Sequence, residues 1–272
     1  MYYVQLKHGL KIPQLGLGVY QTPDGDQTVQ AVKWALNAGY RHIDTAKIYG
    51  NEASVGKGIR ESGVDRGEIF LTTKLWNADI RAGRTREAFF ESLEALQTDY
   101  VDLYLIHWPA DGFEQAWTVM EELHEAGKIG AIGVSNFQKS HLERLAKTAR
   151  IMPAVNQIES HPYFTNQELI KYCFCKDIAV EVWSPLGGTG GNLLEDETLK
   201  MLAEKYGKTP AQIVLRWDIQ RGVVVIPKST HRERIISNQE IFDFELCGKD
   251  MKLIQDLNCC KRVGPDPDHF DF

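Results

Sequence analysis

The sequence predicts an α/β fold of the closed (β/α)8 type, a TIM barrel, formed by a single domain over residues 1–272. Three observations lead to this prediction. The length of 272 residues is close to the roughly 250 residues typical of such a barrel. Eight short apolar runs recur along the chain, and segments with helical periodicity separate them. No Pro/Gly/Ser-rich linker or low-complexity tract divides the chain into parts.

The eight apolar runs are the predicted strands of the barrel. Runs such as VDLYLI and IAVEVW are continuous or nearly so, which is typical of strands that are covered on both faces in a parallel sheet. The predicted strands lie near residues 15–17, 42–44, 69–72, 101–106, 129–134, 154–155, 178–183 and 223–226.

The segments between the runs predict helices. Val29, Val32 and Leu36 repeat with helical spacing in the first of them, and Gly39 follows where a helix-ending glycine is expected. An open, doubly wound sheet is the alternative for the same alternation of elements. A dinucleotide-binding sheet of that kind normally carries GxGxxG after its first strand, whereas this chain has only LGLG at 15–18.

Composition and charge narrow the classes of function. With 43% hydrophobic and 25% charged residues, the chain has the balance of a globular protein. The net charge of -6 argues against a nucleic-acid partner, which would need a concentrated positive surface. The sequence has no apolar run of the roughly 20 residues that span a bilayer and no signal-peptide pattern at its start. Five scattered cysteines without CxxC spacing predict reduced thiols, so we expect a cytoplasmic protein without a membrane partner.

Polar side chains follow the predicted strands at the end of the barrel where chemistry gathers. Loops also begin with polar residues for ordinary reasons, but charged residues at several neighbouring strand ends are costly to bury unless they pair. The residues at these strand ends are Asp44, Lys74, His107, Ser135, Asn136, Asn156, Gln157, Trp183, Ser184, Lys228 and Ser229.

Three of the polar residues form a set with a specific chemistry. Tyr49 follows Asp44 in the segment DTAKIYGNE, and a phenol with its ordinary pKa near ~10 exchanges protons poorly at neutral pH. A lysine cation such as Lys74 would lower the pKa of that phenol, and a carboxylate such as Asp44 would hold the lysine in place. His107 can then orient a substrate carbonyl. Each residue also has an ordinary structural reading, as a loop cap, a surface charge, core packing or a buried histidine.

Several separated motifs resemble one enzyme family. The segments DTAKIYGNE, TTKLW, DLYLIHWP, IGVSNF, NQIE, WSPLG and IPKS occur in the order found in the aldo-keto reductase superfamily, from LGLGVY at residue 15 to about Asn238. KTPAQIVLRW and FDFEL are most similar to the bacterial group that includes 2,5-diketo-D-gluconate reductases. The resemblance implies a barrel with a short N-terminal hairpin and an extra C-terminal helix and tail.

The resemblance also implies an activity, the reduction of aldehydes and ketones by NADPH. Tyr49, Lys74, Asp44 and His107 would be the catalytic residues, with Tyr49 as the general acid. No metal is implied, and the dispersed histidines argue against a metal-dependent hydrolase.

The expected cofactor is NADPH/NADP+. By resemblance, the nicotinamide end would be held by Ser135, Asn136, Gln157, Trp183, Ser184 and Leu186, and the adenosine end by Lys228, Ser229, Arg234 and Asn238. Arginine and lysine beside a hydroxyl suit a 2′-phosphate in an otherwise acidic protein. Many relatives carry glutamate where this chain has Ser237, which changes the surroundings of the adenine.

Aromatic residues would wall the substrate pocket. Tyr20, Trp76 and Trp108, with Phe270 from the tail, are placed there by the resemblance, and His107 would also contact substrate. The glycine-rich stretch GGTGGN after Trp183 indicates an open site. We expect a small-molecule carbonyl substrate, such as a small aldehyde, an α-dicarbonyl or a keto sugar, and a monomeric protein. The alternative is a non-catalytic regulatory barrel that binds NADPH, because a fold alone does not determine a function.

Overall fold

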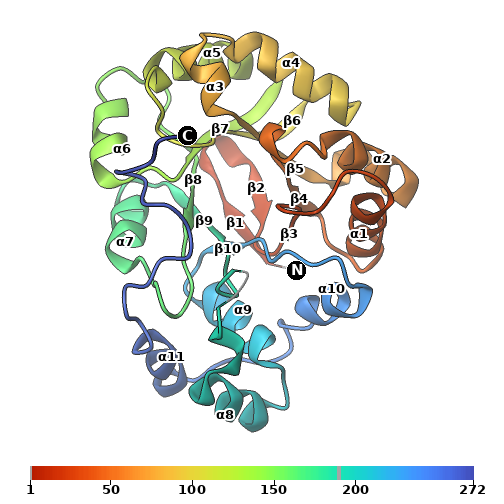
Figure 1. Cartoon of the computed structure of the whole chain (residues 1–272), viewed down its shortest axis with the longest axis vertical. Coiled ribbons are helices and arrows are strands. Elements are labelled where there is room, and N and C mark those ends of the chain that lie inside the picture. The colour runs from red at the N-terminus through yellow and green to blue at the C-terminus, as the bar shows by residue number, and fades with distance from the viewer. Residues whose placement is uncertain (1, 189–190) are drawn as a thin grey trace.

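The computed structural model describes residues 2–188 and 191–272. Within these ranges, eight parallel strands form one sheet in sequence order, and Figure 1 shows them as a ring of arrows. The strands are β3 (Leu17–Gly18), β4 (His42–Asp44), β5 (Phe70–Leu75), β6 (Val101–Ile106), β7 (Ile129–Ser135), β8 (Val155–Glu159), β9 (Ala179–Trp183) and β10 (Val224–Val225).

Parallel pairing between the first and last strands closes the sheet into a barrel. Leu15 pairs with Val225, and Gly18 pairs with Lys228. The main-chain nitrogen of Gly16 donates to the carbonyl oxygen of Val225 across the same seam at 2.8 Å. The predicted (β/α)8 barrel is therefore confirmed. The first predicted strand, 15–17, is displaced to Leu17–Gly18, and Leu15 keeps only a single bridge to β10.

A hairpin plugs one end of the barrel. Strands β1 (Tyr3–Gln5) and β2 (Lys11–Pro13) pair antiparallel, as the resemblance implied. Leu6 and Ile12 of the hairpin are buried in a cluster with Phe70, which begins β5. The hairpin therefore covers the end at which the strands begin, and the opposite end is left for the site.

Helices surround the strands (Figure 1). They are α1 (Asp26–Asn37), α2 (Glu52–Ser62), α3 (Asn77–Arg81), α4 (Thr85–Leu96), α5 (Phe113–Glu125), α6 (Lys139–Leu145), α7 (Gln167–Cys175), α8 (Glu197–Tyr206), α9 (Pro210–Gln220), α10 (Arg232–Gln239) and α11 (Gly248–Gln255). In the described ranges no helix is both long and apolar enough to span a membrane.

The helices turn their apolar sides to the strands. Val29, Val32 and Leu36 of α1 are buried in the main core, as their spacing predicts. Gly39 has a φ of 99° just beyond α1, a conformation that favours glycine, so the helix ends where the sequence predicts. Residue Tyr40 then turns inward and is also buried.

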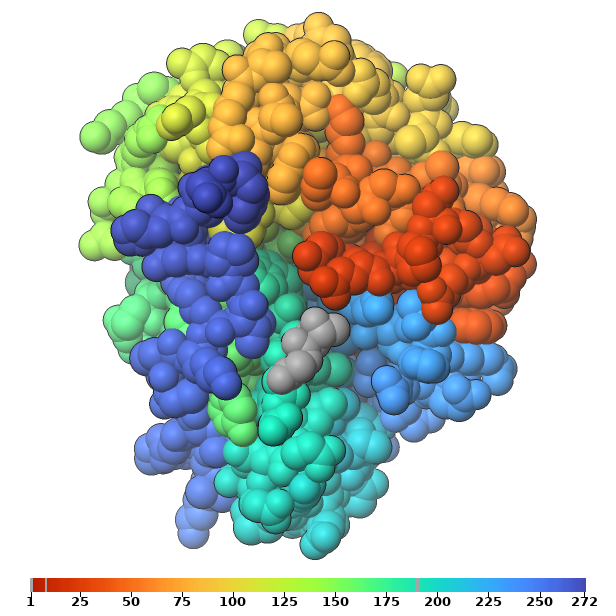
Figure 2. All heavy atoms as spheres, viewed as in Figure 1, coloured from red at the N-terminus to blue at the C-terminus, as the bar shows by residue number. Residues whose placement is uncertain are grey.

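The chain ends in α11 and a tail over residues 256–272 that returns across the open end of the barrel (Figure 1). Figure 2 shows a hollow on this face, bordered by the tail in dark blue and by the N-terminal part of the chain in red. The extra C-terminal helix and tail agree with the expectation from the sequence. The tail thus contributes directly to the rim on which the strand-end residues lie.

Candidate active site

Lys74 is the centre of the predicted catalytic set. It lies in β5, is completely buried, and its Nζ is 2.6 Å from Oδ1 of Asp44 at the end of β4. The same Nζ donates to the carbonyl oxygen of Thr45 at 2.9 Å and lies 3.5 Å from the hydroxyl of Tyr49. The neighbouring strands β4 and β5 therefore bring together the three residues that the sequence singles out.

Tyr49 is carried by a short 3-10 helix, Lys47–Tyr49, that follows β4. Lys47 in the same turn forms ion pairs with Asp79 and Glu91, at 2.9 and 2.7 Å, which tie the turn to α3 and α4. Gly50 has a φ of 67° and ends the turn in a conformation that suits glycine. The phenol is therefore fixed by its neighbours in the chain and by contacts with the next βα unit.

The electrostatics of the buried pair favour a protonated Lys74. Burial lowers the pKa of Lys74, but the nearby Asp44 outweighs it, and the pKa of Lys74 lies above its ordinary value. Burial raises the pKa of Asp44 above its ordinary value, and Lys74 and a hydrogen bond from Gln157 offset this rise only in part. The side chains of Lys74 and Asp44 are 0% and 3% exposed, so solvent screens the pair little.

The expectation of a more acidic Tyr49 was wrong for the protein without ligand. Burial raises the pKa of Tyr49 to about 12, and the lysine beside it lowers this value only in part. The loss of hydration destabilises the phenolate more than the Lys74 cation, 3.5 Å away, stabilises it. Tyr49 therefore keeps its proton at neutral pH, which suits a proton donor.

His107 lies beside the phenol at the end of β6. Its ring centroid is 5.7 Å from that of Tyr49 and 5.3 Å from that of Trp76. Burial, with a smaller effect of Lys74, holds the pKa of His107 well below its ordinary value, so the imidazole is neutral. Its Nδ1 is buried and has no hydrogen-bond partner in the part of the chain that the structure describes.

Four residues predicted to hold a nicotinamide are joined to one another. Asn136 has a φ of 63°, uncommon for a residue other than glycine, and its Nδ2 donates to the carbonyl oxygen of His107 at 3.0 Å. Its Oδ1 accepts from the indole of Trp183 at 2.9 Å. Ser135 donates to the main chain of Gln157 at 2.9 Å. These contacts place the amide, hydroxyl and indole groups along one side of the rim.

The loop after β9 begins at the same place. Ser184 has a φ of 51°, and its carbonyl oxygen accepts from the main chain of Gly187 at 2.9 Å. Leu186 is partly buried and packs against the core. Thr189 and Gly190 of the predicted GGTGGN stretch lie outside the described residues.

The basic segment at the start of α10 has free cations. Lys228 and Arg234 are exposed, and neither forms an ion pair with a described residue. Ser229 and Asn238 are buried, 7% and 6% exposed. Two exposed cations of this segment are therefore available for an anion, although the structure does not bring Arg234 into contact with the catalytic set.

Aromatic residues enclose the mouth. The ring of Tyr20 is 5.0 Å from that of Tyr49, and Trp76 lies against His107. Trp108 is buried and contacts Phe270, at 5.2 Å between ring centroids. The predicted substrate residues are therefore close to the catalytic set.

Sequence reasoning missed the anchoring of the tail. Phe272 stacks on Trp76 at 5.9 Å and lies edge-on to Trp108 at 5.1 Å. Its carbonyl oxygen accepts from Asn77 at 3.1 Å and from Arg81 at 2.9 Å, both in α3. The aromatic residues at the chain end indicate a contact with the pocket, but the sequence does not indicate α3 as the partner, because Asn77 and Arg81 are 195 and 191 residues away from Phe272.

A second missed contact holds the tail near Trp183. Glu159, buried at the end of β8, accepts from the main-chain nitrogens of Val263 at 2.5 Å and Gly264 at 3.3 Å. A Cβ on Gly264 would lie 2.3 Å from the ring of Trp183, so glycine is needed for this close approach. The NQIE motif contains Glu159, but the sequence analysis assigns it no role, and nothing in the sequence identifies its partner.

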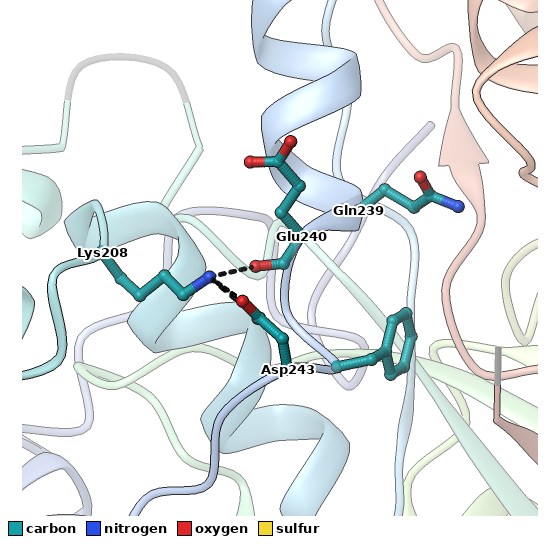
Figure 3. A pocket seen from close by; sticks show the side chains of 5 residues that line it. Lys208, Gln239, Glu240 and Asp243 are labelled. Carbon is teal, nitrogen blue, oxygen red and sulfur yellow. Dashed lines mark hydrogen bonds and ion pairs between the residues drawn. The ribbon is translucent and has the colours of Figure 1, made fainter.

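A separate cavity of about 540 Å³ lies at the end of α10 (Figure 3). It is lined by Lys208, Gln239, Glu240, Phe242 and Asp243. Lys208 is already paired with Asp243 at 2.7 Å and donates to the carbonyl oxygen of Glu240 at 3.1 Å. Lys208 is thus occupied by its neighbours, and the cavity lining contains no residue of the predicted site.

Comparison with known proteins identifies the family. The model of the aldo/keto reductase family matches residues 14–258. The chain is 53% identical to a glyoxal reductase of Bacillus subtilis, over 99% of this chain and 97% of that protein. The chain belongs to the aldo/keto reductase family. As a member, it is an oxidoreductase that acts on carbonyl groups, and a nicotinamide cofactor is typical of the family.

Two further relatives agree with this aldo/keto reductase assignment. Methylglyoxal reductase DkgA of Escherichia coli is 46% identical over 98% of this chain and 97% of its own length. The crystal structure of MGS-M4, an aldo-keto reductase from a Medee basin deep-sea metagenome library, is 45% identical, covers 99% of this chain and all of its own, and has a TM-score of 0.95. The predicted resemblance and the (β/α)8 fold are both confirmed.

Proposed function

We propose that this aldo/keto reductase uses NADPH to reduce small aldehydes, α-dicarbonyls or keto sugars to alcohols. One observation carries the proposal: the hydroxyl of Tyr49 lies 3.5 Å from the buried ammonium of Lys74, beside the neutral ring of His107. Two hydrogen-bond donors of this kind on one side of a pocket suit a carbonyl oxygen that gains negative charge. The aromatic mouth supplies the apolar walls of the pocket.

The chain would supply the proton of the reaction. A nicotinamide, when bound, would supply the hydride for the carbonyl carbon. The carbonyl oxygen would then need one proton to become an alcohol. Tyr49 is protonated at neutral pH, lies beside Lys74, and would supply that proton. Asp44 fixes that lysine, which stabilises the phenolate left behind. Neutral His107 would donate a hydrogen bond and orient the carbonyl before the proton moves.

The residues around Trp183 fit a nicotinamide. The amide oxygen of Gln157 accepts no hydrogen bond from the described residues, so it can accept one from a carboxamide. Ser135 and Asn136 add a hydroxyl and an amide at the same place. The half-buried ring of Trp183 is held by Asn136 and offers a flat face for stacking, as proposed from the sequence.

The preference for NADPH is proposed from the cations at α10. Lys228 and Arg234 are exposed and form no ion pair with a described residue, and the buried Ser229 follows Lys228 in the chain. A planar guanidinium binds a phosphate with two parallel hydrogen bonds, and NADH lacks the 2′-phosphate that would use it. Asn238 would contact the adenine, with Ser184 and Leu186 on the path of the cofactor after β9.

The substrate class is supported by the mouth and by the relatives. Trp76 lies against His107, Tyr20 lies against Tyr49, and Trp108 packs on Phe270 of the tail, so aromatic rings border the catalytic set. Two of the relatives are named glyoxal reductase and methylglyoxal reductase, so α-dicarbonyls are the first compounds to test.

A panel of carbonyl compounds, each supplied with NADPH and with NADH, tests the proposal. We expect the absorbance of NADPH to fall on addition of methylglyoxal or a nitrobenzaldehyde, faster than that of NADH. Binding of NADPH without turnover on any carbonyl would instead favour the non-catalytic regulatory barrel. Activity confined to bulky steroids would contradict the proposed substrate class.

We also propose a cytoplasmic location and a monomeric state. All five cysteines are free thiols, which suits a reducing compartment. Light scattering coupled to size exclusion, with a mass near the 30.8 kDa of one chain, tests the monomer.

A further inference from the structure

Glu181 is an acidic residue inside the barrel that no step proposed above uses. It lies in the middle of β9, is completely buried, and its Oε2 accepts a hydrogen bond from Nε2 of Gln157 at 2.9 Å. Its Oε1 lies 3.4 Å from Nε2 of His42, which is also completely buried. Burial of a carboxyl group is costly unless neighbouring groups form hydrogen bonds with it.

The neighbour that forms a hydrogen bond with Glu181 is Gln157. Its Nε2 donates to Glu181 and also to Oδ2 of Asp44, at 2.8 Å. An amide nitrogen carries two hydrogens, so both are committed to carboxyl oxygens. The amide therefore cannot turn over without placing its oxygen against two acidic groups. Its oxygen, which accepts nothing from the described residues, stays directed away from them.

The charges around Glu181 come from three strands. His42 and Asp44 lie on β4, Lys74 on β5, and Glu181 itself on β9. Burial lowers the pKa of His42 to about 3, so this imidazole is neutral. Burial, together with the charge of Asp44, raises the pKa of Glu181 to about 8. Near neutral pH the cluster thus holds one cation and one anion, and an ionised Glu181 would add a second negative charge.

We propose that Glu181 is a positioning residue that fixes the amide of Gln157 with its oxygen directed to the carboxamide of the cofactor. This inference rests on the proposed cofactor site. Glu181 is also uncharged near neutral pH, because its pKa is raised to about 8. A negative charge beside Gln157 would instead favour oxidised NADP+, whose nicotinamide is cationic, over neutral NADPH. The proton on Glu181 therefore favours the form of the cofactor that reduction requires.

Two variants test the positioning. Glu181→Leu has a similar volume and removes the acceptor, whereas Glu181→Gln keeps an acceptor oxygen without a charge. We expect the Kd of NADPH, measured by quenching of tryptophan fluorescence, to rise about tenfold in Glu181→Leu, as for loss of one buried hydrogen bond. In Glu181→Gln it should stay within about threefold of the original. Circular dichroism shows that each variant is folded before binding is measured. Equal affinity in all three folded proteins would overturn the positioning role.

The uncharged state is tested by pH. In the unmodified protein, the ratio of NADP+ affinity to NADPH affinity should rise several-fold between pH 7 and pH 9, and in Glu181→Gln it should change much less. A ratio that rises equally in both proteins, or in neither, would overturn this part of the proposal. Failure of the cofactor proposal itself is distinguishable, because then the unmodified protein would bind neither NADPH nor NADP+.

Discussion

Nζ of Lys74 lies 2.6 Å from Oδ1 of Asp44 inside the barrel, where both side chains are almost fully buried. A charged pair in this position has little solvent to screen it, and removal of one partner leaves the other charge uncompensated. The pair is therefore both a structural element of the barrel and the group that sets the electrostatics around Tyr49. Its two roles can be separated experimentally.

Asp44→Asn should destabilise the fold. The lysine would keep a buried charge without a carboxylate, and such losses reach about 3–5 kcal/mol in the free energy of unfolding. Urea denaturation followed by circular dichroism measures the change. Glu61→Gln is the matched control, since Glu61 pairs with Lys33 at 3.0 Å on the surface, where solvent screens the pair, and its loss should cost far less stability. Equal costs at the two sites would show that Lys74 is not charged in the folded protein.

Tyr49→Phe should lower kcat by about 10²- to 10⁴-fold, the usual contribution of a positioned proton donor. The Kd of NADPH should hardly change, because the ring remains and only the hydroxyl is lost. Stopped-flow turnover at saturating substrate and fluorescence titration measure the two quantities. Tyr3→Phe, on the distant hairpin, is the control and should behave as the original protein. Near-original turnover in Tyr49→Phe would remove Tyr49 from the reaction.

Much of this site could be predicted because it follows from local patterns. Asp44 and Lys74 stand directly at the ends of apolar runs, and a parallel barrel brings the ends of neighbouring strands together. Tyr49 follows Asp44 closely enough that the connecting turn limits where it can lie. The strand ends and the motif spacing therefore predict that Asp44, Lys74 and Tyr49 are neighbours.

The parts that the sequence did not predict depend on distant contacts or on balances of energy. The run IAVEVW predicts a buried strand that contains Glu181, but a run of residues does not show which of them faces a buried amide. Phe272 meets Arg81 only after the tail has crossed the rim. The sequence predicts a lowered pKa for Tyr49. Burial raises this pKa and the charge of Lys74 lowers it, and the effect of burial is the larger of the two.

Arg234→Ala should raise the Kd of NADPH by at least about tenfold and change that of NADH by less than about twofold. A hydrogen bond between charged groups contributes roughly 1.5–3 kcal/mol, and only NADPH has the phosphate. Fluorescence titration with each cofactor measures the difference. Arg86→Ala, an exposed arginine on α4, is the control. An equal effect of Arg234→Ala on both cofactors would reject the phosphate assignment.

Phe272→Ala should affect large substrates more than small ones. Its ring stacks on Trp76 and lies edge-on to Trp108, so its loss opens one wall of the mouth. An aromatic contact contributes about 0.5–1.5 kcal/mol beyond its area, so KM for an aromatic aldehyde should rise roughly three- to tenfold. KM for methylglyoxal should change little. Phe174→Ala removes an exposed ring from α7 and is the control. A uniform change across substrates would contradict a role of the tail in selection.

Glu181→Gln should change how stability depends on pH. The pKa of Glu181 is about 8 in the folded protein and near ~4.5 when unfolded, so the folded state keeps a proton that the unfolded state releases. Its contribution is fully present below pH ~4.5 and is lost as pH rises through about 8. His42, with a pKa of about 3, acts in the opposite direction, and its contribution is lost as pH falls from ~6.5.

Between pH 6 and pH 8 only the loss due to Glu181 should therefore distinguish the unmodified protein from the variant. At about 1.4 kcal/mol per pH unit for one proton, the free energy of unfolding of the unmodified protein should fall by about 2 kcal/mol relative to Glu181→Gln over this range. Urea denaturation at pH 6, 7 and 8 measures both curves. His42 remains in both proteins and cancels in the difference. Two parallel curves would mean that Glu181 is already ionised in the folded barrel at pH 6, and the uncharged acid would then not be what holds Gln157.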